Sequence, residues 1–366
     1  MLLIDEWVDS LKARIDGKLF DGRDIFYFDD ESSALPNTRK SDSREPAGRP
    51  QTAQLRFDAL SSEWITVASH RQQRAFLPPA HSCPLCPTTQ ENLSELPDQF
   101  DVAVFENKGP AFGPEANVID LPNGERFGFS TTSYGRCEVV VFSPDHVGSL
   151  SEMPVERVET VIRAWMNRTA ELQQIRGVVQ VFPFENRGEE IGVTLHHPHG
   201  QIYAYPFVTP RTQKLIQSVD SFSGDFFAEL VKFEKSGNRT ILETENFLAF
   251  VPFAARWPIE AHLLPKRQIN DLSQLTADEA VELAQVYKRL LQAFDSYYET
   301  PTPYISAWHQ APMIEGREKI RLMLQITSPR RAADKLKYLA GSESAMGAFV
   351  ADIAPEETAA RLREVI

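Results

Sequence analysis

Short apolar runs and longer amphipathic stretches alternate along this chain. The short runs are rich in β-branched and aromatic residues, which is typical of strands. They lie at 25–28, 64–67, 102–107 and 136–142. A longer stretch, 154–172, has apolar residues at helical spacing and predicts an amphipathic helix. Its apolar positions are Val158, Val161, Ile162 and Trp165.

The same order of elements recurs in the second part of the chain. Strand-like runs at 247–251 and 259–264 precede a helix that is predicted from the capping pattern at Thr276 through Phe294. A further strand and the hairpin after it also repeat. Residues 179–182 of the first half correspond to 304–308 of the second, and the histidine-rich turn at 197–199 corresponds to 322–326. The pattern predicts two similar halves, although simple α/β meanders that look alike by chance remain the alternative.

The two halves differ where chemistry is expected. The first half has histidines in its last hairpin, whereas the second half has Met323 and Gln325 at the matching positions. We therefore expect one half to carry the reaction and the other to be structural or to help bind substrate. The polar stretch 29–54, with its prolines and mixed charges, predicts a long loop or a partly disordered segment.

Composition narrows the class of protein. The chain has 366 residues, 42% of them hydrophobic, which fits a globular protein with one large or two ordinary domains. No apolar run approaches a membrane span, and the acidic N-terminus does not resemble a signal peptide, so we expect a cytoplasmic protein with no membrane partner. A net charge of −13 argues against nucleic-acid binding. Three cysteines make a disulfide framework implausible.

Candidate chemistry concentrates in the run from Thr194 to Gln201, which holds three histidines and is followed by a strand-like stretch. Neutral imidazole is a good nucleophile toward phosphorus, so this run predicts phosphoryl or nucleotidyl transfer through a covalent histidine. The pair Cys83 and Cys86 has the spacing of a zinc knuckle, with a reduced cytosolic redox pair as the alternative.

These residues resemble those of a known family. His197–Gln201 (HPHGQ), preceded by Phe184–Gly188 (FENRG), is similar to the galactose-1-phosphate uridylyltransferases, the transferase branch of the histidine-triad superfamily. The resemblance extends in order over most of the chain. It covers 64–86, 104–107, 142–146, 184–205, 243–266, 308–312 and 331–343.

The resemblance implies a fold and a domain plan. We expect an α+β protein in which two histidine-triad-like halves share a continuous, mostly antiparallel sheet with flanking helices. The expected boundaries are 1–54 for an N-terminal strand and polar loop, 55–210 for the catalytic half, and 211–366 for the half without the catalytic histidine.

The resemblance also implies catalytic roles. His199 takes the position of the nucleophile that attacks the α-phosphorus of a UDP-sugar; the alternative is a simple turn residue. Gln201 is expected to donate its amide to a phosphoryl oxygen, unless it is only a solvent-facing strand residue. Thr194 stands where the family has a serine hydroxyl, and Gly200 permits close approach to phosphate.

Substrate-binding roles follow from the same comparison. Six residues match family positions near the nucleotide, the active-site loop or the hexose phosphate: Arg71, Arg74, Asn107, Asn186, Lys337 and Glu343. For the two arginines the alternative is a solvated pair of loop charges, and for the C-terminal pair it is an ordinary basic helix start. The chain departs from the family at Lys108, where some relatives have an acidic residue, and at Gln310, where the family has glycine.

The family pattern completes a metal site. His146 and His197 stand at the positions of the two remaining ligands beside Cys83 and Cys86, which implies one structural Cys2His2 zinc site. Some relatives have a second metal site made of a glutamate and three histidines. Here His309 is the one histidine left, because Met323 and Gln325 replace the others, so we predict no second metal.

The resulting hypothesis is a cytoplasmic, homodimeric UDP-glucose–hexose-1-phosphate uridylyltransferase of galactose catabolism. It would move UMP from UDP-glucose to galactose 1-phosphate by a ping-pong mechanism, releasing glucose 1-phosphate and UDP-galactose. The alternatives are another nucleotidyltransferase of the superfamily, such as a dinucleoside-tetraphosphate phosphorylase, and a catalytically silent sugar-nucleotide binder.

Overall fold

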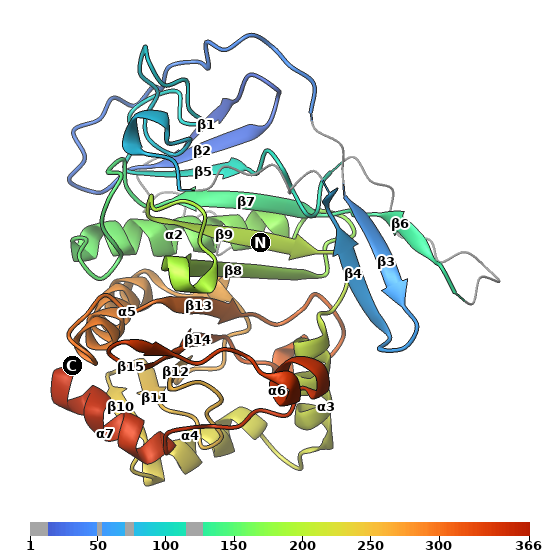
Figure 1. The fold of residues 1–366 in the computed structure, drawn as a ribbon, viewed down its shortest axis with the longest axis vertical. Helices are drawn as coiled ribbons and strands as arrows, with labels where there is room; N and C mark the ends of the chain where they lie inside the picture. Colours follow the sequence, from blue (N-terminus) through green and yellow to red (C-terminus); the bar gives the residue numbers. More distant parts are fainter. Residues whose placement is uncertain (1–13, 50–52, 70–76, 115–126) are drawn as a thin grey trace.

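A computed structural model describes residues 14–49, 53–69, 77–114 and 127–366. An 11-stranded sheet crosses the whole molecule (Figure 1). All of its neighbouring strands pair antiparallel. In spatial order they are β1 (Ile15–Lys18), β2 (Asp24–Phe28), β5 (Val102–Glu106), β7 (Arg136–Val141), β9 (His199–Tyr205), β8 (Gln180–Arg187), β13 (Tyr304–His309), β14 (Met323–Ser328), β12 (Ile259–Pro265), β11 (Phe247–Phe250) and β10 (Thr240–Glu243).

The junction between β8 and β13 divides this sheet into two halves. The strands on the β8 side come from the first half of the chain, and those on the β13 side come from the second half. In Figure 1 the junction lies at mid-height, between the green strands and the orange ones. The prediction of an α+β fold with two halves in one continuous antiparallel sheet is confirmed.

Long helices cover one face of the sheet. Helix α2 (Val155–Leu172) and helix α5 (Ala277–Ser296) pack against each other, and α7 (Pro355–Val365) packs beside α5. The four apolar positions predicted in the first helix are all buried in the main core. Helix α5 begins as predicted, with a capping box in which Thr276 and Glu279 bond reciprocally to each other's backbone.

Several elements were not anticipated from the sequence. Edge strand β1 extends the main sheet, and strands β3 (Gln54–Asp58) and β6 (Ser130–Thr132) join the predicted strand β4 (Glu63–Val67) in a small separate sheet. The others are α3 (Pro210–Ser221), α4 (Phe226–Ser236), β15 (Arg330–Ala332), β16 (Lys335–Leu336), α6 (Gly341–Met346) and short 3-10 turns at Ala80–Ser82, Glu189–Ile191, Leu272–Gln274 and Arg317–Lys319. Most of these elements are short, so the pattern of apolar residues gives them a weak signal.

Loops cover the other face of the first half. Apolar residues of β2, β5 and β7 pack there against Cys83, Leu85, Leu96 and Phe100 from the loop between β4 and β5. The polar residues 29–49, predicted to form a loop, contain no helix or strand. Within the described ranges, none of the helices combines the length and apolar character needed to cross a membrane.

Candidate active site and metal centre

Strand β9 positions the histidine motif. Alternate residues of the strand face opposite sides of the sheet, and Gly200, Ile202 and Ala204 are buried on the side covered by the helices. His199 and Gln201 therefore lie on the opposite face, where they pair in register with Val141 and Val139 of β7.

Hydrogen bonding selects one reactive nitrogen of His199. Its Nδ1 lies 2.7 Å from the backbone oxygen of His197. A carbonyl oxygen can only accept, so Nδ1 carries the proton and the lone pair is on Nε2. Burial lowers the pKa of His199, which keeps the ring neutral and nucleophilic near neutral pH.

Four side chains form a compact metal-binding cluster beside this histidine. The ligand atoms of Cys83, Cys86, His146 and His197 all lie within 4.8 Å of one another. The His197 Nδ1 lies 3.8 Å from the Cys83 Sγ and 3.5 Å from the Cys86 Sγ, and the His146 Nδ1 lies 3.5 Å from the Cys86 Sγ. Tetrahedral bonds of about 2.3 Å to sulfur and about 2.0 Å to nitrogen place such atoms roughly 3.5 Å apart, so the donor set fits one tetrahedral ion.

The orientation of His197 suits metal binding. Its Nε2 lies 2.8 Å from the Ser143 oxygen and donates to it, which leaves the Nδ1 lone pair directed at the two thiols. His197 therefore links the metal cluster to the candidate nucleophile. Its ring faces the cluster, while its carbonyl oxygen accepts a hydrogen bond from the Nδ1–H of His199.

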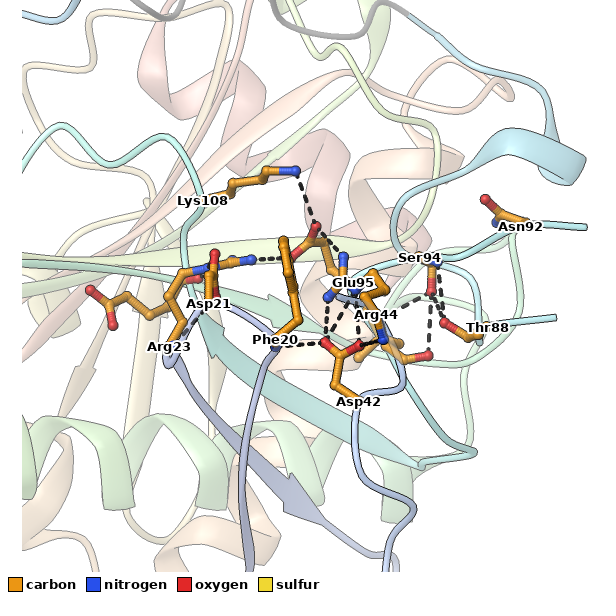
Figure 2. A network of polar contacts seen from close by, with 12 residues as sticks. Phe20, Asp21, Arg23, Asp42, Arg44, Thr88, Asn92, Ser94, Glu95 and Lys108 are labelled. Carbon is orange, nitrogen blue, oxygen red and sulfur yellow. Dashed lines mark hydrogen bonds and ion pairs between the residues drawn. The ribbon is translucent and has the colours of Figure 1, made fainter. Parts of the chain in front are cut away.

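A buried ionic network fixes the loop that carries the two cysteines. Figure 2 shows Arg23, Arg44 and Lys108 converging on Glu95. The Glu95 N–H donates to the Pro84 oxygen at 3.0 Å. The departure at Lys108 thus places a cation 3.8 Å from a carboxylate of this network.

A cleft of about 470 Å³ opens beside the histidine motif. Its walls come from the turn at 146–149, the end of β8 with the following turn, and the segment leading into β9. The lining residues are His146–Ser149, Glu185–Glu189, Val193 and Leu195–His199. The nucleophile candidate, two metal-ligand candidates and Asn186 thus share one cleft.

Gln201 has an unused hydrogen-bond acceptor. Its Oε1 is buried and has no hydrogen-bond partner within the described chain. Gln325 is the third residue of β14, as Gln201 is of β9, and both ends of its amide are hydrogen-bonded. It accepts from His309 Nε2 at 3.1 Å and donates to Glu260 at 2.6 Å. The Gln201 oxygen thus lacks the kind of partner that the Gln325 oxygen has in the second half.

Comparison with known proteins agrees with this arrangement. The model of the galactose-1-phosphate uridyl transferase N-terminal domain matches residues 42–209, and that of the C-terminal domain matches residues 213–366. The chain belongs to the galactose-1-phosphate uridylyltransferase family. The protein of this name from Streptomyces lividans is 38% identical, over 95% of this chain and 96% of its own length. The one from Thermotoga maritima is 35% identical, over 85% of this chain and 98% of its own.

Solved structures give the same answer. A uridylyltransferase structure superposes with a TM-score of 0.75 and 31% identity, covering 85% of this chain and 98% of that one. An ADP-glucose phosphorylase from Arabidopsis thaliana, with bound ADP-glucose, superposes with a TM-score of 0.66 and 25% identity, covering 86% of this chain and 99% of that one. The chain therefore has the same fold as these two proteins.

The structure places most of the remaining candidate residues in contact with neighbouring residues of the chain. Arg71 and Arg74 fall outside the described residues. The backbone oxygen of Thr194 accepts the Leu77 N–H at 2.8 Å. The side chain of Asn107 accepts the Gly109 N–H at 2.9 Å.

The Lys337 Nζ lies 3.6 Å from the Glu343 Oε1, so the two residues form an ion pair. Lys337 also lines a smaller cavity of about 230 Å³. Close packing explains why residue 200 is a glycine, because an added Cβ would lie 2.9 Å from both the Phe142 ring and the Phe184 oxygen.

Sequence reasoning missed two site residues, Glu185 and Arg187. Both line the cleft of the transferase and flank Asn186, the one residue of the FENRG motif that was singled out. The motif itself contained the signal, since a charged residue within a strand, such as Glu185, needs partners once it is buried. Burial raises the pKa of Glu185 to about 7 despite the nearby Arg187.

The departure at Gln310 also has a structural explanation. Its side chain is buried, accepts the Leu272 N–H at 2.8 Å and donates to the Val181 oxygen at 3.0 Å and the Thr169 hydroxyl at 3.3 Å. In this transferase, glutamine therefore joins the two halves where the family has glycine.

Proposed function

We propose that this protein transfers UMP from UDP-glucose to galactose 1-phosphate through a covalent intermediate on His199. The observation that carries the proposal is the bond from the His199 Nδ1 to the His197 oxygen, which leaves the Nε2 lone pair at the cleft. A nucleophile with a fixed tautomer needs no proton transfer before attack.

The reaction proceeds in two displacements at the same phosphorus. The His199 Nε2 attacks the α-phosphorus of UDP-glucose, a P–N bond forms, and the P–O bond to the leaving glucose 1-phosphate breaks. A phosphate oxygen of galactose 1-phosphate then attacks, a new P–O bond forms, and the P–N bond breaks to release UDP-galactose. The imidazolium of the intermediate keeps its Nδ1 proton and donates it in a hydrogen bond to the His197 oxygen, which stabilises the positive charge.

Other residues are assigned supporting roles in this proposal. The Gln201 amide donates to a non-bridging phosphoryl oxygen, in keeping with its position two residues along the strand from His199. Thr194 and Gly200 contact phosphate, and Asn186 holds the active-site wall. Substrate binding is assigned to Arg71, Arg74 and Asn107 on the nucleotide side and to Lys337 and Glu343 on the hexose side.

We infer that the metal is a single structural zinc ion. Two thiols and two imidazoles are the donor set that zinc prefers, and their spacing fits tetrahedral coordination. When bound, zinc would fix the segment carrying His197 against the cysteine loop, and Cys83, Cys86, His146 and His197 would hold it. The absence of a second metal, the homodimer and the cytoplasmic location stay predictions.

Intact-mass spectrometry after brief mixing with UDP-glucose tests the function. We expect the mass of one UMP on the wild type, its removal by galactose 1-phosphate, and no adduct on His199→Ala. His196→Ala is the matched control, because His196 is an exposed histidine of the same cleft. It should still form the adduct.

Three results would overturn parts of the proposal. An adduct on His199→Ala would exclude this nucleophile. UDP-glucose binding to the wild type without an adduct would favour the silent binder. An adduct formed from ADP-glucose but not from UDP-glucose would favour an adenylyl-transferring enzyme, the activity class suggested by the ADP-glucose phosphorylase neighbour.

A further inference from the structure

The wall of the cleft that faces His199 is built by the first half but anchored by the second. This wall runs from Glu185 to Glu189, from the end of β8 into the following 3-10 turn, and Glu190 comes next in that turn. We propose that Asp295, Tyr304 and Arg330 of the second half are positioning residues for uridylyl transfer, acting through this wall. The inference rests on the proposed reaction at His199.

The first anchor is an ion pair between Arg187 and the end of helix α5. The Arg187 Nη1 lies 2.7 and 2.8 Å from the two oxygens of Asp295. Asp295 is itself fixed, since it accepts the Thr302 N–H at 2.9 Å and the Ser151 hydroxyl at 2.8 Å. The carboxylate therefore has little freedom to follow Arg187 if the wall moves.

The second anchor is a buried acid held by two tyrosines. The Glu185 Oε2 lies 3.1 Å from the Tyr304 hydroxyl and 3.5 Å from the Tyr287 hydroxyl, and Tyr287 bonds to Ser306 at 2.7 Å. Glu185 also pairs in register with Ser306 across the β8–β13 junction. All three partners belong to the second half.

The third anchor fixes the turn after β8. Gly188 has a φ of 105°, and an added Cβ would lie 2.7 Å from the Pro303 Cβ, so the turn packs directly on the second half. Two residues later, Glu190 accepts from the Arg330 Nη2 at 3.0 Å.

The first two anchors act on alternate residues of strand β8, Arg187 and Glu185, and this has a geometric consequence. Glu185 and Arg187 are bonded on the side of helix α5, so strand alternation directs the intervening Asn186 to the face of His199. A shift of the wall would displace Asn186 relative to the reacting phosphorus. Misplacement of about 1 Å can slow a reaction roughly 100-fold.

The test compares Asp295→Asn with Glu279→Gln. Both carboxylates lie on helix α5, about 24 Å apart at 1.5 Å per residue. Like Asp295, Glu279 pairs with an arginine through two contacts, to Arg267 at 2.9 and 2.7 Å, and accepts a backbone N–H, that of Thr276 at 2.8 Å. Glu279 is remote from the cleft, so it controls for general loss of stability.

Two readouts are measured on each purified variant. The first is the single-turnover rate of UMP adduct formation at saturating UDP-glucose, for which we expect a fall of roughly 10- to 100-fold with Asp295→Asn and less than about twofold with Glu279→Gln. The second is amide hydrogen exchange of residues 186–193 without substrate, which should quicken only in Asp295→Asn.

Equal effects of the two variants on both readouts would overturn the inference. Hydrogen exchange needs no reaction, so a wild type that forms no adduct would refute the proposed function while the anchoring is still tested. If Asp295→Asn does not fold, Tyr304→Phe removes a single hydroxyl from the second anchor. Its control is Tyr298→Phe, whose hydroxyl bonds to the Arg331 oxygen at 2.7 Å. Unchanged adduct rate and exchange in Tyr304→Phe would also overturn the inference.

Discussion

Replacing Glu185 by glutamine should change how stability depends on pH. Burial raises the pKa of this carboxyl to about 7 from the 4.5 of an exposed glutamate. A carboxyl with a raised folded-state pKa favours the folded protein fully below its unfolded pKa, and this contribution is lost as pH rises through the folded pKa. The loss lies between about pH 4.5 and pH 7.

The magnitude follows from the size of the shift. At about 1.4 kcal/mol per pKa unit, the difference between about 7 and 4.5 corresponds to roughly 3 kcal/mol of folding free energy. Glutamine has nearly the same shape and cannot ionise. We therefore expect the wild type to lose stability relative to Glu185→Gln as pH rises, by about 2 kcal/mol between pH 5.5 and 8.

Urea unfolding at several pH values, followed by tryptophan fluorescence on metal-loaded protein, measures this difference. Glu279→Gln is the control. Although burial opposes it, hydrogen bonds from Arg267 lower the pKa of Glu279, so its contribution is lost only as pH falls below the window. This variant should lie below the wild type by a constant amount. Parallel curves for wild type and Glu185→Gln would refute the reasoning, because they would mean that Glu185 does not titrate between pH 5.5 and 8.

Two further predictions concern the junction and the metal. Gln310→Ala should lower the free energy of unfolding by about 2–4 kcal/mol, because the buried Leu272 N–H and Val181 oxygen lose their partner; a change below about 0.5 kcal/mol in urea unfolding would contradict this. Removing the metal with a chelator should release one zinc ion per chain and slow adduct formation, since the carbonyl of His197 holds the His199 proton. A chromogenic chelator measures the metal release, and the adduct rate should recover when Zn²⁺ is added back. An unchanged adduct rate in the metal-free protein would show that the ion does not position the nucleophile.

The fold was largely predictable because the chain repeats its pattern. The long helices have clear apolar periodicity and, for α5, a capping box, and the central strands are continuous apolar runs. Edge strand β1 was not predictable, because its sequence Ile15–Lys18 is half exposed and contains glycine. Helix α6, with six residues, is too short to show a period.

The sequence predicted those parts of the candidate site that lie within local motifs. The spacing of Cys83 and Cys86 indicated a metal, but only the family resemblance added His146 and His197, which are distant in sequence. The anchors at Asp295 and Tyr304 were missed, because a contact across the β8–β13 junction leaves no local pattern. Likewise, the sequence could not show that the side-chain oxygen of Gln201 is buried without a hydrogen-bond partner, because burial depends on the folded structure.

The shared sheet limits how the molecule can be divided. Although two family models match the two parts of the chain, strand β8 of the first part pairs with β13 of the second over residues 184–187. A fragment ending near residue 210 would turn β8 into a bare sheet edge and leave the carboxylate of Glu185 without its tyrosines. The half that contains the histidine motif is therefore not a separate folding unit, and a truncation at this boundary would cut through a continuous hydrogen-bonded sheet.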